Sequence, residues 1–364
     1  MSDRSDATVA WRGDFAAAHS LALVNRELTR RLDGRGFAVR TEERTAKPGP
    51  ADLRVTHGWP PALSNPGNGR WIAMQPWEFG SMPRTWLAPF RDRADEVWTP
   101  SNWNRDRYIE DGLDPDHVVV VPNGVGPEFQ PSAPPLARIR DAAADRIRFL
   151  FVGGTIKRKG IDVLLEAWRK AFTADDRVAL IIKDFCKSGA YRGQTQEGLI
   201  AEAAAVPGTA PIVYVDDDLP ATELPGLYTA CDVLVHPYRG EGFGLPVLEA
   251  LACGRPTIVT KGGACDDFCD RDSSLFIAGD RRPVRPAEPL VREGFLLEPS
   301  VGQLAGLLRL AAAHPERMRA MGESAAKRVA RDWTWDRSAE IAADRIKAVL
   351  ARTASPSKRT PVAV

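Results

Sequence analysis

Two glutamates, Glu241 and Glu249, flank a glycine-rich turn with the spacing Glu-x7-Glu. The turn follows an apolar run, 231–236, and precedes an apolar segment, 245–252, so the pattern predicts a strand, a sharp turn and a helix. Such a turn points backbone N–H groups beyond the end of the strand, and the helix dipole adds positive potential there. The arrangement suits an anion, with one carboxylate in the loop and the other on the helix.

The string HPYRGEGFGLPVLEALACGRPTIVT, residues 236–260, resembles the C-terminal signature of retaining GT-B glycosyltransferases of family four. In that family the first glutamate contacts the donor sugar, the second holds the ribose of the nucleotide, and the glycine loop receives the diphosphate. The resemblance implies these roles for Glu241, for Glu249 and for the loop made of Gly242, Phe243, Gly244 and Leu245. The alternative is that Glu249 caps a surface and Glu241 is a solvated loop acid.

A basic turn, Lys157-Arg158-Lys159, follows the predicted strand 147–152. Three cations facing a helix N-terminus are unfavourable unless an anion binds there, although a solvated basic turn is the alternative. In the family this segment supplies an Arg and a Lys to the diphosphate. Lys159 matches the Lys, whereas Gly154 occupies the Arg position. The resemblance implies donor binding by Lys159 and Arg158, and Lys183, at the end of strand 178–183, is a candidate for the missing charge beside its neighbour Asp184.

The N-terminal half offers weaker candidates for the site. Gly13 follows the first predicted strand, where a Rossmann-like domain brings its backbone close to a ligand, and it is compatible with donor phosphate contact. Many family members place a His beside the sugar after the fourth strand. The residue there is Gln75, and His57 is the nearest alternative, so both join Glu241 as catalytic candidates.

Tryptophans follow two of the N-terminal strands, in loops that also hold proline and a few polar residues. Aromatic platforms with a few polar groups suit sugar binding. Packing beneath long loops is the equally weighted alternative for Trp59, Trp77 and Trp86.

Length and composition limit the class of protein. A chain of 364 residues favours two domains, and a net charge of +1 without long charge runs gives no indication of a nucleic-acid partner. Five irregularly spaced cysteines are typical of reduced thiols, and Cys265-x3-Cys269 lacks a second pair of metal ligands. Without an apolar signal core or a membrane-length segment, we expect a soluble, cytoplasmic protein with no integral membrane segment. We interpret the Asp216–Asp218 triplet as capping a following helix.

Strand and helix patterns alternate almost throughout, which predicts an α/β fold with parallel sheets covered by helices. The resemblance implies the GT-B fold, in which two Rossmann-like domains have parallel sheets that face each other across a cleft and a C-terminal helix crosses back to the first domain. We expect an acceptor-side domain at 1–130, a donor-binding domain at 145–335, the returning helix at 336–352 and a disordered tail at 353–364. The Pro-rich stretch 131–135 marks the linker.

The expected function is transfer of a hexosyl or related sugar from a nucleotide-sugar donor, UDP- or GDP-linked, to an acceptor hydroxyl with retention of configuration. The acceptor is a glycan, a lipid-linked sugar or a small metabolite, and neither a metal nor another cofactor is expected. A non-hydrolysing nucleotide-sugar epimerase and a non-catalytic nucleotide-sugar binding protein of the same fold are the alternatives. A glycosidase would also use two carboxylates, but it has no diphosphate to hold.

Overall fold

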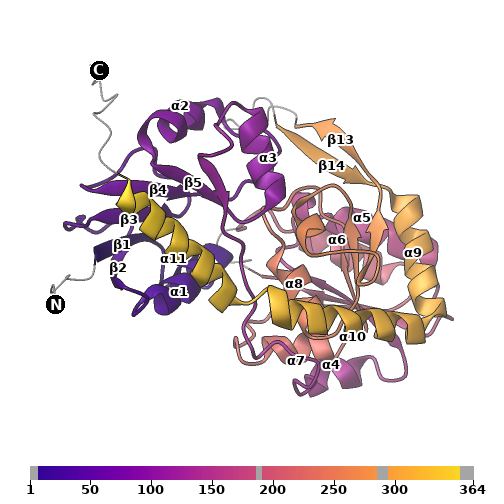
Figure 1. The fold of residues 1–364 in the computed structure, drawn as a ribbon. Helices are drawn as coiled ribbons and strands as arrows, with labels where there is room; N and C mark the ends of the chain where they lie inside the picture. The colour runs from indigo at the N-terminus through magenta and orange to yellow at the C-terminus, as the bar shows by residue number, and fades with distance from the viewer. Residues whose placement is uncertain (1–6, 186–190, 285–293, 353–364) are drawn as a thin grey trace.

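The structure is a computed structural model that describes residues 7–185, 191–284 and 294–352. Its first domain contains a six-stranded parallel sheet in the order β2-β1-β3-β4-β5-β6 (Figure 1). Helices cover both faces of this sheet. The elements are β1 (Ala7–Gly13), α1 (Ser20–Leu32), β2 (Phe37–Glu43), β3 (Leu53–His57), β4 (Arg70–Met74), α2 (Arg84–Arg93), β5 (Glu96–Thr99), α3 (Asn102–Glu110) and β6 (Val118–Val120).

The second domain repeats this plan with the strand order β12-β11-β10-β7-β8-β9, again all parallel. The predicted α/β, GT-B-type fold class is confirmed. The elements are α4 (Ala137–Ala142), β7 (Ile147–Val152), α5 (Ile161–Ala171), β8 (Val178–Lys183), α6 (Glu197–Ala205), β9 (Ile212–Val215), α7 (Leu224–Thr229), β10 (Val233–His236), α8 (Leu245–Ala252), β11 (Thr257–Thr260), β12 (Ser274–Ile277), α9 (Val301–Ala313) and α10 (Pro315–Asp332), with short 3-10 turns η1 (Lys157–Lys159) and η2 (Ala264–Asp267).

Each sheet has one point where the chain reverses the direction in which it adds strands. In the second sheet this switch point lies between β7 and β10, and in the first sheet it lies between β1 and β3. In open parallel sheets, the helices on either side of a switch point diverge, so the loops at the carboxyl ends of those strands leave room for a ligand. The topology alone therefore selects the loops after β7 and β10, and those after β1 and β3.

A third, two-stranded sheet was not predicted. Strands β13 (Gly279–Pro283) and β14 (Phe295–Pro299) pair antiparallel and form a hairpin that reaches the first domain, where Phe295 N donates to Phe79 O at 2.9 Å. The sequence of β13 is charged and exposed, which hides it from a search for apolar strands. The sequence also predicts a late strand at 294–298, and β14 confirms it, although β14 pairs with β13 outside both parallel sheets.

The chain crosses between the domains twice, and the two crossings lie side by side. Val125 N donates to Trp333 O at 3.0 Å, and Val125 and Thr334 form a β-bridge. Helix α11 (Trp335–Ala351) then packs along the first domain against α1, as the yellow helix of Figure 1 shows. At the far end of α11, Arg345 and Arg352 both pair with Glu96, whose side chain is fully buried at the start of β5.

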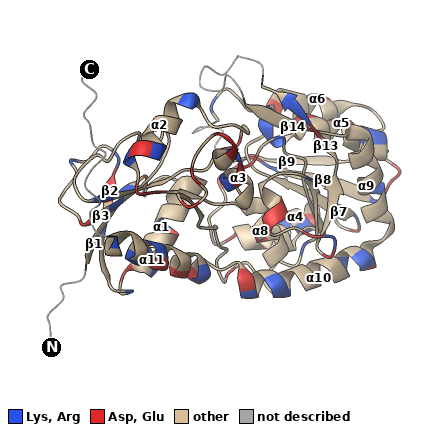
Figure 2. Ribbon diagram, turned by 45° about the horizontal axis from the view of Figure 1, so that its top comes forward, with Lys and Arg blue, Asp and Glu red and all other residues tan. Residues whose placement is uncertain are grey.

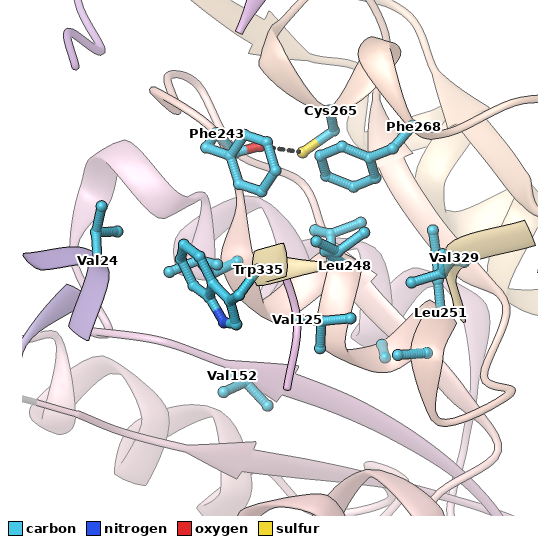
Figure 3. Packing of buried hydrophobic residues seen from close by; sticks show 14 of the residues in the cluster. Val24, Val125, Val152, Phe243, Leu248, Leu251, Cys265, Phe268, Val329 and Trp335 are labelled. Carbon is cyan, nitrogen blue, oxygen red and sulfur yellow. Dashed lines mark hydrogen bonds between the residues drawn. The ribbon is translucent and has the colours of Figure 1, made fainter. Parts of the chain in front are cut away.

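One cluster of buried apolar side chains runs continuously through both domains. Figure 3 shows Val24 from the first domain and Leu248 and Phe243 from the second on either side of Trp335, the first residue of α11. Because the crossing segment itself lies inside this cluster, the returning helix is part of the core of the protein.

Charges are interspersed over both domains, and α10 carries both blue and red residues in Figure 2. Within the described ranges, no helix has the length and apolar character needed to span a bilayer. The four described cysteines are buried and free. No cluster of three or more His, Cys, Asp or Glu side chains suited to a metal ion occurs in that part of the chain.

Some predicted details differ from the structure. The Asp216–Asp218 triplet does not cap α7, because α7 begins at Leu224 with Glu223 at its N-cap, and Asp217 instead pairs with Arg138 at 2.7 Å. The spacing of apolar residues over 16–32 predicts the first helix from residue 16, whereas α1 begins only at Ser20, where His19 caps it. The tail at 353–364 lies outside the described residues.

Candidate functional site

The switch point of the second sheet brings together the two segments that sequence analysis selected. The basic turn η1 follows β7, and the glycine loop follows β10, which is the neighbour of β7 in the sheet. Backbone contacts join the two segments, since Arg239 N donates to Arg158 O at 2.7 Å. The loops therefore form one surface at the carboxyl edge of the sheet.

Lys159 and Glu241 form a buried ion pair at the centre of this surface. The ammonium Nζ of Lys159 donates to Glu241 Oε1 at 2.6 Å, and both residues are more than nine-tenths buried. His236, the last residue of β10, lies 3.0 Å from the same carboxylate oxygen through Nε2. The Glu241 carboxylate is thus held by two side chains, Lys159 from the basic turn and His236 from the end of β10.

The pKa values of these groups follow from burial and from the pair itself. Burial alone would raise the pKa of Glu241, but Lys159 and His236 outweigh it and hold that pKa well below its ordinary value. Burial likewise opposes the charge on Lys159, yet Glu241 raises its pKa. Burial lowers the pKa of His236, so this ring is neutral at pH 7 and donates Nε2–H to the carboxylate. Glu241 is therefore an ionised carboxylate inside the protein.

Two arginines fix the geometry of the loops. Arg158 Nη1 donates to Gly240 O at 2.6 Å, and its guanidinium lies 3.9 Å from Glu78 of the first domain. Arg239 is more completely enclosed, with two hydrogen bonds to Asp162 and two to Glu298. Arg239 is therefore committed to holding the loop, while Arg158 stands beside Lys159 at the boundary between the domains.

Gly160 makes the close approach of the two loops possible. Its φ of 75° is in the left-handed region, and a Cβ there would lie 1.9 Å from the carbonyl oxygen of Pro237. Gly208 has nearly the same φ, 77°, but a Cβ there would meet nothing within 4 Å. The two glycines thus share a backbone conformation and differ in their surroundings.

We expect Gly160→Ala to lower the free energy of unfolding by about 2–3 kcal/mol, because a backbone oxygen cannot move aside and the left-handed conformation is also strained. Gly208→Ala is the matched control and should cost only about 1 kcal/mol, the conformational part alone. Urea denaturation of both variants measures the difference. Equal losses would show that the contact with Pro237 is unimportant.

The loop between the two glutamates presents free backbone donors. The N–H groups of Gly242, Phe243, Gly244 and Leu245 donate to no acceptor within residues 7–185, 191–284 or 294–352. The carbonyl of Gly242 is occupied by Ser101 of the first domain, whose Oγ donates to it at 2.9 Å. The ring of Phe243 points into the core against Phe268, as Figure 3 shows. The loop therefore offers amides rather than side chains, as an anion site requires.

Glu249 lies in α8, and its surroundings differ from those of Glu241. Its Oε2 accepts a hydrogen bond from Tyr228 Oη at 2.6 Å, and the residue is only 7% exposed. Burial raises the pKa of Glu249 to about 7, against the lowering effect of the Tyr228 hydrogen bond. The two acids of the motif therefore differ in charge at neutral pH: Glu241 is ionised and Glu249 is close to half protonated.

This difference predicts a pH dependence of stability. The pKa of Glu249 is about 7 in the folded protein against an ordinary value of 4.5, so between these values the folded chain keeps a proton that the unfolded chain has lost. The contribution of Glu249 to the free energy of unfolding is therefore fully present below pH 4.5. It decreases by up to about 3 kcal/mol as pH rises through 7. In Glu249→Gln this decrease disappears. The melting temperature of the variant minus that of the wild type should increase from pH 5 to pH 8, and parallel curves would contradict the shifted pKa.

Lys183 lies away from this group. Its ammonium donates to two backbone carbonyls, Asp184 O at 2.6 Å and Asp217 O at 2.7 Å, and it stands over the ring of Phe185. The carboxylate of Asp184 is engaged elsewhere, with Thr155 and Tyr214. The structure thus brings Lys159 and Arg158 to Glu241 and gives Lys183 partners at the end of β9.

The space beside Gly154 is filled by an aromatic ring. A Cβ on Gly154 would lie 2.3 Å from the ring of Tyr191, and the tyrosine hydroxyl interacts with Arg158. A long side chain at Gly154 would have to displace this ring. In this chain the Tyr191 ring fills the space beside Gly154, and Arg158 is the second cation beside Lys159.

The first-domain candidates separate into two groups. Gln75 follows β4 and is buried, with Nε2 donating to Pro76 O, and Pro76 packs close to Gly242 across the domain boundary. His57 bonds Asn25 of α1 at 2.8 Å, and burial lowers its pKa to about 3, so it is neutral. A Cβ on Gly13 would clash with the side chain of Asn25 and the carbonyl of His57, so close packing alone explains why this position is a glycine.

Sequence reasoning named no role for His236, although it lies within the quoted motif. Its partner Glu241 is five residues later, across a proline and a glycine. The signal that was available is its position as the last residue of a buried strand, where a polar side chain needs a partner.

Comparison with known proteins follows this geometry. Residues 136–328 match the family described as Glycosyl transferases group 1. The D-inositol 3-phosphate glycosyltransferase of Acidothermus cellulolyticus is 32% identical over 231 residues, which cover 62% of this chain and 50% of that protein. The chain spans about half the length of the curated relatives it matches.

Solved structures share the fold over nearly the whole chain. Sucrose-phosphate synthase from Thermosynechococcus elongatus superimposes with a TM-score of 0.71 at 18% identity, covering 95% of this chain and 99% of that one. Anabaena HepE in complex with UDP-glucose superimposes with a TM-score of 0.68 at 12% identity, covering 94% and 100%.

Proposed function

The chain belongs to the glycosyl transferases group 1, and we propose from this premise that it transfers a sugar from a nucleotide-sugar donor to an acceptor hydroxyl with retention of configuration. The observation that carries the proposal is the group of Lys159, Arg158 and Glu241 at the second-domain switch point, beside the free amides of residues 242–245. Cations and amides suit a diphosphate, and a buried ionised carboxylate suits the hydroxyls of a sugar.

In this proposal the diphosphate lies on Lys159, Arg158 and the amides of 242–245. Glu249 accepts hydrogen bonds from the ribose, and Glu241 holds the transferred sugar, whose ring gains positive charge as the bond to phosphate breaks. The leaving phosphate takes the acceptor proton on the same face, so no enzymic nucleophile is needed. The rate then depends chiefly on stabilising charge on the leaving group. HepE, of the same fold, was solved with UDP-glucose, which favours a UDP-linked donor here.

Gln75 and His57 remain the first-domain candidates, and their surroundings rank them. Gln75 precedes the segment that packs on Gly242, whereas the side chain of His57 is hydrogen-bonded to Asn25. We therefore assign the first-domain contact with the sugar to the Gln75 segment.

Incubation with UDP-, GDP-, ADP- and TDP-linked sugars, with and without an acceptor extract, tests the function. Release of nucleotide diphosphate only in the presence of acceptor supports a transferase. An anomeric carbon in the product with the same configuration as in the donor, read from the NMR signal of its proton, supports retention. An epimeric sugar formed without acceptor would identify an epimerase instead. Binding of the nucleotide sugar with no turnover under any condition would favour the non-catalytic alternative.

We expect transfer to survive an excess of EDTA. The diphosphate charge is met in the proposal by Lys159, Arg158 and backbone amides, so a bridging metal ion has no place in it. Initial rates with and without EDTA measure this. If EDTA abolishes transfer and Mg²⁺ or Mn²⁺ restores it, the Asp216–Asp218 triplet must be reconsidered as a metal site.

A further inference from the structure

Trp59 is the most exposed large apolar side chain of the described residues. It is 44% exposed, and Leu199 on α6, at 36%, is the only other large hydrophobic residue in the described ranges that counts as exposed. Trp59 lies in the loop after β3, two residues beyond its last residue, His57. Exposing an indole to water is unfavourable, because its large apolar surface forgoes the free energy that burial would supply.

Two buried tryptophans hold this side chain in place. Trp59 stacks on Trp77, with ring centroids 6.0 Å apart and an interplanar angle of 24°, and its edge meets Trp86 at 6.0 Å. Trp77 and Trp86 are 2% and 3% exposed and belong to the core between α2 and the sheet. One face of the Trp59 indole is thus supported by the protein, and the side chain is a rigid platform rather than a loose loop residue.

Polar side chains from two other loops surround the platform. Arg44, which follows β2, hydrogen-bonds the carbonyls of Trp59 and Pro60. Its guanidinium lies 3.8 Å from Asp14, which follows β1, and His19 lies 3.9 Å from the same carboxylate. These side chains are about one-third exposed, so they offer donors and acceptors to a ligand. An exposed aromatic face with a guanidinium and a carboxylate beside it is a composition that binds hydroxyl-rich rings.

The position of the platform is also that of a ligand site. The loops after β1 and β3 flank the switch point of the first sheet, so Asp14 and Trp59 lie where an open parallel sheet leaves room for a ligand. The platform is connected to the donor loop as well. A Cβ on Gly242 would lie 2.9 Å from Pro76 and 3.6 Å from the backbone nitrogen of Trp77, the residue on which Trp59 stacks.

We propose that Trp59 is the stacking platform of the acceptor subsite, and that the acceptor presents a neutral hexopyranose ring there, with its C–H face on the indole and its hydroxyls on Asp14 and Arg44. This inference rests on the proposed function, since the ring it binds is that of the acceptor. A phosphorylated ring is disfavoured, because the Asp14 carboxylate, 3.8 Å from the Arg44 guanidinium, would repel the phosphate. The tryptophans thus divide their roles: Trp77 and Trp86 pack, and Trp59 binds.

Saturation-transfer difference NMR on the full chain tests the proposal without knowledge of the natural acceptor. The probes are the methyl α-pyranosides of glucose, mannose and galactose, maltose, and myo-inositol 1-phosphate, each with and without UDP. We expect at least one hexopyranoside to receive saturation on its ring C–H protons. Trp59→Ala should weaken that binding by about tenfold, and Trp59→Phe should restore most of it, because a smaller aromatic face remains.

Leu199→Ala is the control, because it removes the other exposed large apolar side chain of the described residues, which lies in the second domain. It should change no signal, and UDP affinity should be the same in all variants. Binding of myo-inositol 1-phosphate alone, or of no probe, would overturn the proposal, as would equal loss of UDP affinity in Trp59→Ala. If hexopyranosides bind through Trp59 while no nucleotide binds, the subsite stands and the proposed donor chemistry fails.

Discussion

Glu241→Gln should lower kcat by about 100- to 1000-fold while leaving the affinity for nucleotide diphosphate nearly unchanged. The carboxylate it removes is ionised, buried and held by Lys159 and His236, so its charge acts in a medium of low dielectric. The transferred sugar gains positive charge only as the bond to phosphate breaks, so the interaction is strongest in the transition state. Steady-state kinetics with saturating donor, together with calorimetry using the nucleotide diphosphate, separates the two effects.

Glu249→Gln is the comparison for this prediction. Glu249 is assigned to the ribose, which does not react, so its loss should mainly raise the donor KM and weaken nucleotide diphosphate binding. Equal losses of nucleotide affinity in the two variants would refute the division of roles between the glutamates. Both variants must be assayed below their melting temperatures, since each alters a buried polar group.

Lys159→Met should destabilise the folded chain by about 3–5 kcal/mol, the cost of leaving one member of a buried ion pair alone. The contact with Glu241 thus gives Lys159 a part in the stability of the fold in addition to the donor-binding role that the resemblance implies. The double variant Lys159→Met/Glu241→Gln removes both charges and should recover most of the loss. Urea denaturation of the two single variants and the double variant measures the coupling.

Lys157→Met is the matched control, because Lys157 belongs to the same basic turn and is exposed. It should change stability by less than about 0.5 kcal/mol. Nucleotide diphosphate binding should weaken in Lys159→Met by about 1.5–3 kcal/mol and remain unchanged in Lys157→Met. A double variant as unstable as the sum of its single variants would show that the pair is not coupled.

The sequence was most informative where local pattern and chemistry coincide. The periodicity of strands and helices predicted two parallel sheets, and the glycine-punctuated motif placed Glu241 and Glu249 around one turn. Their opposite pKa shifts were not predictable, because they depend on Lys159 and Tyr228, which lie 82 and 21 residues away in the chain. The switch points could not be located from the sequence either, because their location depends on the order of the strands in each sheet, and no local sequence pattern reveals that order.

The tryptophans show the same limit. Trp59 and Trp77 follow strands in similar loops, yet one is exposed and the other is buried beneath it. Only their stacking decides which side chain is free to bind a ligand. Likewise, β13 could not be predicted, because its charged residues follow no apolar pattern. It is a strand because it pairs with β14.

The contact of Glu96 with the C-terminal part of α11 and the residue after it has a consequence for synthesis on the ribosome. Glu96 is a fully buried carboxylate, and its partners Arg345 and Arg352 are the 249th and 256th residues after it. A nascent first domain, emerging N-terminus first, has no such partners and also lacks the apolar surface of α11. It must therefore remain incompletely packed until α11 leaves the exit tunnel. A stalled or truncated chain lacking α11 would expose that surface and become a substrate for chaperones and proteases, so synthesis through α11 is a condition for a stable first domain.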